Sequence, residues 1–215
     1  MIREPQILAC SGALYPPADY RHPGAQIWQA MRLADVRRPR VCLIATATGD
    51  SREHITGWYE RAGSFGDAEL SHLTLFTQPN VPDVRAHLRA QDVIFVSGGS
   101  VVNLLAVWRA HRLEEILREC WESGVVLAGQ SAGSLCWHLG GVTDSFGDRL
   151  DVVADGLAFL PFSNGVHEDG VALHYVGTRL HEAVAVLPER HACFIEPGPG
   201  GSHRETAIPA RLWMP

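Results

Sequence analysis

The chain has 215 residues, of which 46% are hydrophobic and 20% charged, and its formal net charge is −6. This length suits one sizeable α/β domain over residues 1–215 and is short for two domains. The negative charge argues against a nucleic-acid partner and against anionic membrane surfaces. No apolar run approaches the roughly 20 residues that a membrane span requires, so no membrane association is predicted.

The cysteines and histidines carry no pattern typical of a disulfide framework or a metal site. The five cysteines lie far apart without a C-x-x-C pair, and the eleven histidines are scattered without a spacing such as H-E-x-x-H. We therefore expect reduced core thiols, no metal and no cofactor. The amino terminus, MIREPQILAC, is charged and then enters an apolar run, unlike a signal peptide, which favours a cytoplasmic protein.

The first ninety residues alternate between apolar runs typical of strands and segments with helical spacing. Strands are predicted at 6–10, 41–45 and 70–76, and helices at 24–33, from 50–51 to about 63, and from 82–83 to 90. This alternation predicts an α/β fold with a doubly wound, mostly parallel sheet and helices on both faces, in three layers. The site of such a fold lies beyond the carboxyl ends of the strands.

The stretch from 92 to 137 contains two short, apolar, β-branched runs, Val93–Val96 and Val125–Ala128, with a helical pattern between them. Each run is closed by a glycine-rich turn, at 97–100 and at 129–133. Fully apolar runs of this length predict neighbouring parallel strands that are buried on both faces.

The second turn, Gly129-Gln130-Ser131-Ala132-Gly133, matches the nucleophile-elbow pattern G-x-S-x-G. A serine that attacks a carbonyl must stand on a sharp strand-to-helix turn, and small residues on either side allow the backbones to pack. The N–H groups of Ala132 and Gly99 are the candidates for an oxyanion hole. The alternative is a helix start whose small residues serve only tight packing.

The chain after the elbow has a different character. Gly140-Gly141 is predicted to end the elbow helix, which would carry His138, and residues 142–167 are expected to be rich in loops. A strand is predicted at 171–176, and the segments 183–187, 192–195 and 207–212 are expected to form a hairpin-like edge. Residues 197–201, PGPGG, are predicted to form a loop tip.

A serine nucleophile needs a base within hydrogen-bond reach and a group that orients this base. Spacing alone does not choose among the histidines and carboxylates that follow Ser131, which are His138, His167, His174, His181, His191 and His203, with Asp144, Asp151, Asp155, Glu168 and Asp169. Asp144 lies in a Thr-Asp-Ser-Phe-Gly segment, where it either lines the cleft or caps a turn.

Several of these segments together resemble the dipeptidase E/cyanophycinase family of serine peptidases. They are Ser97–Ser100 with Asn103-Leu104-Leu105, Ala128–Ser134, Thr143–Gly147, Leu160–His167 and Asp169–His174. The resemblance runs from about residue 6 to residue 178. It implies a flavodoxin-like fold of the class I glutamine amidotransferase type, with a serine where those enzymes use cysteine.

The resemblance also implies roles for individual residues. His167 matches the family's base, and Asp169, directly before Gly170, matches the acid that orients it. Gly98, Ser100 and Asp144 are the expected substrate contacts.

This chain departs from the family in two places. Relatives carry a charged segment between the histidine and the acid, with an arginine that holds an aspartyl side chain, whereas here His167 is followed directly by Glu168. Because both flanking motifs are intact, a loop missing from the sequence is favoured over a true deletion. Ser100 also replaces the family's asparagine, which puts a preference for aspartate in doubt.

The sequence therefore predicts a cytoplasmic serine peptidase, similar to dipeptidase E, that hydrolyses short peptides through an acyl-enzyme. The predicted partner is a small peptide substrate, with the chain as a monomer or homodimer. The enzymatic alternative is an esterase-type acyl hydrolase on the same elbow. A non-catalytic binding protein on the same fold is the other alternative, which a true loss of the arginine-bearing segment would favour.

Overall fold

The computed structural model describes residues 3–12, 24–61, 66–164, 169–197 and 203–213. The strands of the main sheet are β1 (Gln6–Cys10), β2 (Arg40–Ile44), β3 (Glu69–Leu73), β4 (Val93–Val96), β5 (Val126–Gln130), β9 (Val171–Val176), β10 (Arg179–Ala185), β11 (His191–Pro197) and β12 (His203–Leu212). The helices are α1 (Ala25–Ala34), α2 (Arg52–Glu60), α3 (Val84–Arg89), α4 (Val101–Ala110), α5 (Leu113–Glu122) and α6 (Ala132–Leu135), with a short 3-10 turn at Thr46–Thr48.

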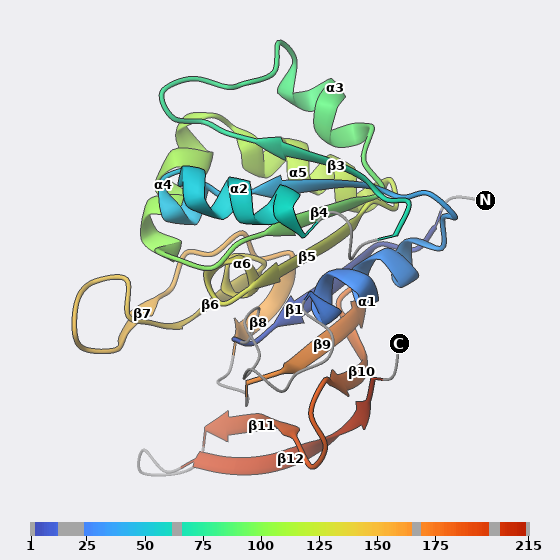
Figure 1. The fold of residues 1–215 in the computed structure, drawn as a ribbon. Coiled ribbons are helices and arrows are strands. Elements are labelled where there is room, and N and C mark those ends of the chain that lie inside the picture. The colour runs from blue at the N-terminus through green and yellow to red at the C-terminus, as the bar shows by residue number, and fades with distance from the viewer. Residues whose placement is uncertain (1–2, 13–23, 62–65, 165–168, 198–202, 214–215) are drawn as a thin grey trace.

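Within the described residues the main sheet has nine strands in the order β11-β12-β10-β9-β1-β5-β4-β2-β3 (Figure 1). The strands from β1 to β3 in this order pair in parallel. β9 and β10 continue the sheet in antiparallel pairs beyond β1, and β12 then pairs with β10 in parallel. The predicted α/β fold with a doubly wound, mostly parallel sheet is confirmed.

Successive residues of the central strands point into two different apolar layers. In β1, Ile7 and Ala9 join the core cluster that contains buried residues of α4 and α5, whereas Leu8 and Cys10 join the cluster that contains buried residues of α1. This alternation follows from the two-residue period of a strand and requires helices on both faces. The three-layer prediction is therefore also confirmed (Figure 1).

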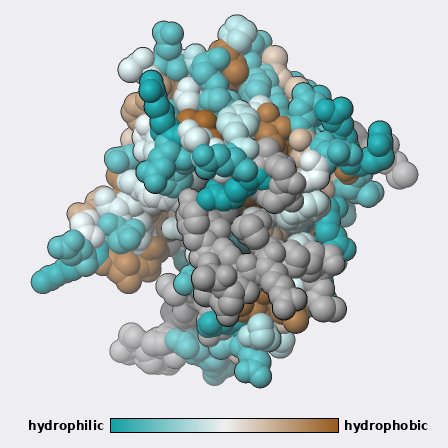
Figure 2. Space-filling view, viewed as in Figure 1, coloured by the Kyte–Doolittle hydropathy of each residue, from teal (hydrophilic) through white to brown (hydrophobic). Residues whose placement is uncertain are grey.

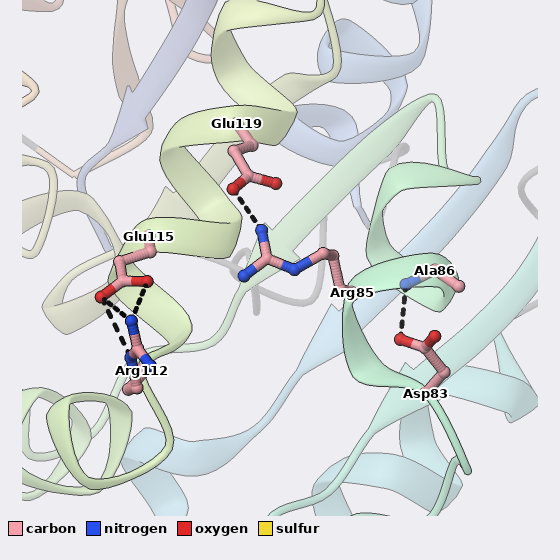
Figure 3. Close-up of polar contacts among 6 residues, drawn as sticks. All are labelled: Asp83, Arg85, Ala86, Arg112, Glu115 and Glu119. Carbon is pink, nitrogen blue, oxygen red and sulfur yellow. Dashed lines mark hydrogen bonds and ion pairs between the residues drawn. The ribbon is translucent and has the colours of Figure 1, made fainter.

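Several helix boundaries follow from capping groups that are visible in the sequence. The Asp83 carboxylate accepts a hydrogen bond from the Ala86 N–H at 2.9 Å and so begins α3, as predicted (Figure 3). Arg85 of α3 forms an ion pair with Glu119 of α5 (Figure 3). The helical pattern predicted between β4 and β5 is divided into two helices at Arg112, whose φ is 54°.

A second, three-stranded sheet follows the elbow and was not predicted. It consists of β6 (His138–Thr143), β7 (Asp151–Val153) and β8 (Leu160–Asn164) in the order β7-β6-β8. The predictions that Gly140-Gly141 end a helix and that His138 lies on it are wrong. A Cβ on Gly140 would lie 2.2 Å from the Val153 carbonyl oxygen, so this glycine permits the close approach of β7.

The predicted carboxyl-terminal edge is present, with β10, β11 and β12 longer than the apolar runs that indicated them. The predicted loop tip at 197–201 lies almost entirely outside the described residues. All five cysteines are free thiols, and four of them are buried. None of the helices in the described ranges is long and apolar enough to span a membrane.

His174 is a buried base in the middle of the sheet. Its Nε2 lies 2.9 Å from Oε1 of Gln6, an acceptor, so Nε2 carries the proton. Its Nδ1 is buried without a hydrogen-bond partner. Burial and then the neighbouring His181 lower the pKa of His174 to about 4. A proton added at Nδ1 would therefore carry a charge whose burial outweighs the attraction of the nearby Glu182 carboxylate.

We expect this histidine to destabilise the fold in acid. Between the ordinary histidine pKa of about 6.5 and the folded value of about 4, the unfolded chain binds a proton that the folded chain does not, so stability is lost as pH falls. The difference corresponds to about 3 kcal/mol, which partial solvation reduces to about 2 kcal/mol. Urea unfolding at neutral pH and near pH 4 measures this loss.

His174→Gln is expected to have a smaller decrease in unfolding free energy over this pH range than the wild type. His111→Gln, at an exposed position, is the matched control and should behave like the wild type. An unchanged pH dependence in His174→Gln would show that other groups cause the acid sensitivity.

Candidate active site

Ser131 stands on a sharp turn between β5, which ends at Gln130, and α6, which begins at Ala132. Its backbone has φ 53° and ψ −112°, a region that residues with a Cβ rarely adopt, at a cost of about 1–3 kcal/mol. The side chain is exposed, whereas all four residues of α6 are buried. The turn thus holds an exposed serine at the carboxyl end of a central strand, in a strained conformation.

The two glycines of the motif are required by close backbone contacts. A Cβ on Gly129 would lie 2.2 Å from the Gly133 carbonyl oxygen, and a Cβ on Gly133 would lie 2.2 Å from the Val96 carbonyl oxygen. The chain therefore passes against itself and against the end of β4 at distances that leave no room for a side chain. This is the physical reason for the predicted spacing of small residues around Ser131.

Hydrogen bonds hold the Ser131 backbone from two sides. Its N–H donates to the Cys10 carbonyl at the end of β1, at 3.1 Å. Its carbonyl accepts hydrogen bonds from the N–H groups of Ser134 and Leu135, both at 2.9 Å. The sheet and the first turn of α6 together fix the position from which the side chain projects.

The turn after β4 lies directly beside Ser131. A Cβ on Gly98 would lie 3.2 Å from the Ser131 Cβ and 3.8 Å from its Oγ. Gly99 has φ 137°, and a Cβ there would lie 2.3 Å from the Ala47 carbonyl oxygen, so this position requires glycine. The Ser100 hydroxyl accepts a hydrogen bond from the Asn103 N–H at 3.2 Å and so caps α4. The Ser100 hydroxyl only accepts in this bond, so its own proton is still available to a ligand and its predicted substrate contact stays a prediction.

Asp169 lies at the end of β1, on one side of the nucleophile. A Cβ on Gly12 would lie 2.4 Å from Oδ1 of Asp169, so the carboxylate rests against the Gly12 backbone. The Gly170 N–H donates to the Gly12 carbonyl at 3.3 Å. Because β1 is the neighbour of β5, Asp169 and Ser131 lie at the ends of adjacent strands.

Asp144 lies on the other side of the nucleophile, in an exposed turn after β6. The next residue, Ser145, accepts a hydrogen bond at 3.0 Å from the N–H of Val101, the first residue of α4. Its hydroxyl is also 2.8 Å from that of Thr143. The turn is thus attached beside the Gly98-Gly99 turn, on the β4 side of β5. The two candidate acids therefore flank Ser131 from opposite sides.

His167, the predicted base, and Glu168 lie outside the described residues. The 215-residue sequence runs without interruption from His167 to Glu168, so the charged segment of the family is absent from this chain and the expectation of a further loop there is wrong. The described residues contain no cluster of three or more metal-ligating side chains.

One buried polar contact beside Asp169 was not anticipated from the sequence. The buried Gln26 of α1 donates from Nε2 to the carbonyls of Ser11 and Gly12, at 3.2 and 3.3 Å, and so fixes the turn against which Asp169 rests. The only signal was a glutamine within the apolar pattern of a helix.

A cavity of about 680 Å³ lies near the starts of β2 and β3, at the ends of the strands opposite to Ser131. It is lined in part by Trp28, Met31 and Arg37.

The sequence model of Peptidase family S51 matches residues 7–198. A Bacillus subtilis (strain 168) protein named "Uncharacterized peptidase YgaJ" is 36% identical over 172 residues, which cover 69% of this chain and 74% of the relative.

Two crystal structures share the fold. One is that of a putative peptidase E from Listeria monocytogenes EGD-e, with a TM-score of 0.63 and 14% identity over 86% of this chain and 100% of that chain. The other is that of a peptidase from an acI-B1 Actinobacterium, with a TM-score of 0.68 and 17% identity over 97% of this chain and 96% of that chain.

Proposed function

The chain belongs to Peptidase family S51 and is a serine-type peptidase, and from this premise we propose that it hydrolyses short peptides with Ser131 as the nucleophile. The observation that carries the proposal is the strained backbone of this exposed serine, at φ 53° and ψ −112°, between two turns whose glycines permit close packing. Strain of this kind persists where the surrounding structure enforces it, as at the nucleophile of a strand-turn-helix elbow.

The proposed reaction proceeds through an acyl-enzyme. Ser131 Oγ attacks the scissile carbonyl carbon while His167 takes the hydroxyl proton, and the protonated imidazole then gives this proton to the leaving amine. A water molecule, activated by the same base, hydrolyses the ester and restores the serine. The N–H groups of Gly99 and Ala132 are the proposed donors to the oxyanion. Ala132 is the first residue of α6, and the first N–H groups of a helix have no acceptor within it.

Asp169 is the proposed orienting acid. It is two residues from His167 in the sequence, and its carboxylate rests against the Gly12 backbone at the end of the strand next to β5. Asp144 lies across the nucleophile in an exposed turn, where it is better placed to line the substrate cleft.

Asp169→Asn is therefore expected to lower kcat/KM by about a thousandfold or more, because the amide no longer holds the imidazole tautomer or stabilises its charged form. Asp144→Asn is the matched variant and should change kcat/KM by about tenfold at most. Steady-state kinetics with one dipeptide, on variants whose unfolding curves match the wild type, measures both effects. A larger loss in Asp144→Asn would transfer the role to Asp144.

Selectivity for an amino-terminal aspartate is expected to be weak. The segment that carries the family's substrate-binding arginine is absent from this chain, and the hydroxyl of Ser100 caps α4. An arginine–carboxylate pair in a dry site contributes about 2–3 kcal/mol, so its loss removes a tens- to hundredfold preference. We expect the kcat/KM values for Asp-Leu and Leu-Leu to agree within about tenfold. A strong preference for Asp-Leu would require another cation at the site.

Two measurements test the proposed function. A fluorophosphonate probe should label the wild-type chain at Ser131, identified by peptide mass spectrometry, and should leave Ser131→Ala unlabelled. A panel of dipeptides beside p-nitrophenyl esters then separates a peptidase from an esterase, since a peptidase must cleave the amide bond at a substantial rate. Labelling at another serine, or hydrolysis of esters alone, would refute the proposal.

A further inference from the structure

We propose that Gln26 is a positioning residue for catalysis, because it holds the Ser11-Gly12 turn in the place where this turn supports the carboxylate of Asp169. The inference rests on the proposed function, in which Asp169 orients the base. Gln26 lies on α1, which packs beside β1 and β5 (Figure 1). Since its side chain is buried, Gln26 acts through the turn and not on the substrate.

Gln26 is a polar side chain in an apolar place. Figure 2 shows polar residues over much of the visible surface of the described part of the chain, whereas Gln26 is only 4% exposed. The neighbouring residues of α1, Ala25 and Ile27, are buried with it. Burial of an amide opposes folding unless new hydrogen bonds replace those that it made with water. The partners of this amide therefore show what the residue does.

The hydrogen bonds of the Gln26 amide all go to one turn. Its Nε2 donates to the carbonyl oxygens of Ser11 and Gly12, at 3.2 and 3.3 Å. Carbonyl oxygens only accept, so the nitrogen of the amide must face the turn. Its Oε1 is buried and has no hydrogen-bond partner among the described residues. An apolar side chain of similar length would avoid the cost of this unpartnered oxygen, so the glutamine contributes its two donors to the turn.

The same turn is bonded to the residues that follow Asp169. The Ser11 N–H donates to the Val171 carbonyl at 2.9 Å. The Ser11 hydroxyl donates to the same oxygen at 2.8 Å and accepts from the Val171 N–H at 3.0 Å. The Gly170 N–H donates to the Gly12 carbonyl at 3.3 Å. Because Gly170 and Val171 directly follow Asp169 in the chain, a displacement of the turn would carry Asp169 with it.

The turn also contacts the carboxylate of Asp169 itself. A Cβ on Gly12 would lie 2.4 Å from Oδ1 and 3.3 Å from Cγ of Asp169. A group that orients a catalytic base must be held within a fraction of an ångström, and an error of about 1 Å can cost about a hundredfold in rate. Gln26 is thus connected to the placement of the carboxylate through a single turn.

Gln26→Met tests the proposal, because methionine has a similar length but no donor for the two carbonyls. We expect kcat to fall about 10–100-fold, which is less than the loss expected for Asp169→Asn, and KM to change by less than about threefold. Gln29→Met is the matched control, since Gln29 is 6% exposed and lies one turn further along α1. It should keep kcat within about twofold of the wild type. Steady-state kinetics with one dipeptide, on variants whose unfolding curves match the wild type, measures these values.

A double-mutant cycle separates positioning from a general loss of structure. If Gln26 acts through Asp169, Gln26→Met should change kcat by less than about threefold in the Asp169→Asn background. A role in structure alone would lower kcat by the same factor in both backgrounds, because the two effects would then be independent. Equal factors in the two backgrounds would therefore overturn the proposal.

Gly12→Ala tests the same support without a change at Gln26. Gly12 is not among the glycines with positive φ, so its backbone suits alanine, and the three atoms nearest to the new Cβ all belong to the Asp169 side chain. We expect a retained fold and a fall in kcat of about tenfold or more, because the carboxylate must move aside. A Gly12→Ala chain with the kcat of the wild type would overturn the proposal even if Gln26→Met does not fold.

Failure of this inference differs from failure of the proposed function. Near-normal kcat in Asp169→Asn would refute the role of Asp169 and with it the role of Gln26. An impaired Asp169→Asn beside a normal Gln26→Met would overturn the role of Gln26 alone and leave that of Asp169 in place.

Discussion

Replacement of Ser131 by alanine is expected to lower peptidase kcat/KM by about a thousandfold or more while the fold is retained. The hydroxyl is exposed at the end of β5 and contributes little packing, so its removal costs almost no stability. Without Oγ no acyl-enzyme can form, and only the binding and oxyanion interactions remain. Steady-state kinetics beside urea unfolding measures both quantities, and near-normal turnover in Ser131→Ala would refute the assignment.

Ser131→Gly separates the chemical role of this residue from its backbone strain. Glycine adopts positive φ freely, so this variant should be as inactive as Ser131→Ala but more stable by about 1 kcal/mol, after the entropic cost of glycine in the unfolded chain is subtracted. Alanine retains a Cβ and hence the strain. Equal unfolding free energies for the two variants would show that the turn is not strained in solution.

Gly133→Ala is expected to damage stability and activity together. Its Cβ would lie 2.2 Å from the Val96 carbonyl oxygen, and this atom belongs to the backbone at the end of β4 and cannot rotate away. The elbow must then move from β4, which we expect to cost about 2–4 kcal/mol in unfolding free energy and at least about a hundredfold in kcat/KM.

Gly57→Ala is the matched control for this substitution. A Cβ on Gly57 would lie 3.4 Å from the flexible end of the Arg61 side chain, which is an ordinary contact. Because Gly57 lies within α2, alanine should raise stability by up to about 1 kcal/mol and leave activity unchanged. Chemical unfolding and kinetics on the two variants test the contrast. A stable, active Gly133→Ala chain would contradict the close contact with β4.

The elements that the sequence predicted best are those whose signals are local. β1, β4 and β9 have the predicted bounds, because each is a short, predominantly apolar run next to a glycine-containing turn. The turn between β5 and α6 was predicted from five residues, since its two glycines are needed by contacts within the motif and with the adjacent strand. Asp83 was predicted to open α3 because a capping side chain acts within three residues.

The three-stranded sheet of β6, β7 and β8 shows where local signals mislead. The pair Gly140-Gly141 after a helical start is a typical helix end, yet these glycines belong to a strand. Gly140 is required by the carbonyl of Val153, thirteen residues later, and no pattern around Gly140 reveals this contact. The exposure of Val142 and Val152 could not be predicted for the same reason, because exposure depends on which strands pair and on what covers them.

The sequence by itself determined the alternation of strands and helices, the elbow and the identity of the nucleophile candidate, since these depend on side-chain chemistry over a few residues. Only the tertiary structure decided which distant segments lie at the ends of the strands on either side of β5. It placed Asp169 against Gly12 and Asp144 beside the start of α4, on opposite sides of the serine. The physical reason is that the order of strands in the sheet, with β5 between β1 and β4, brings these segments together, and strand order is set by packing of the whole core.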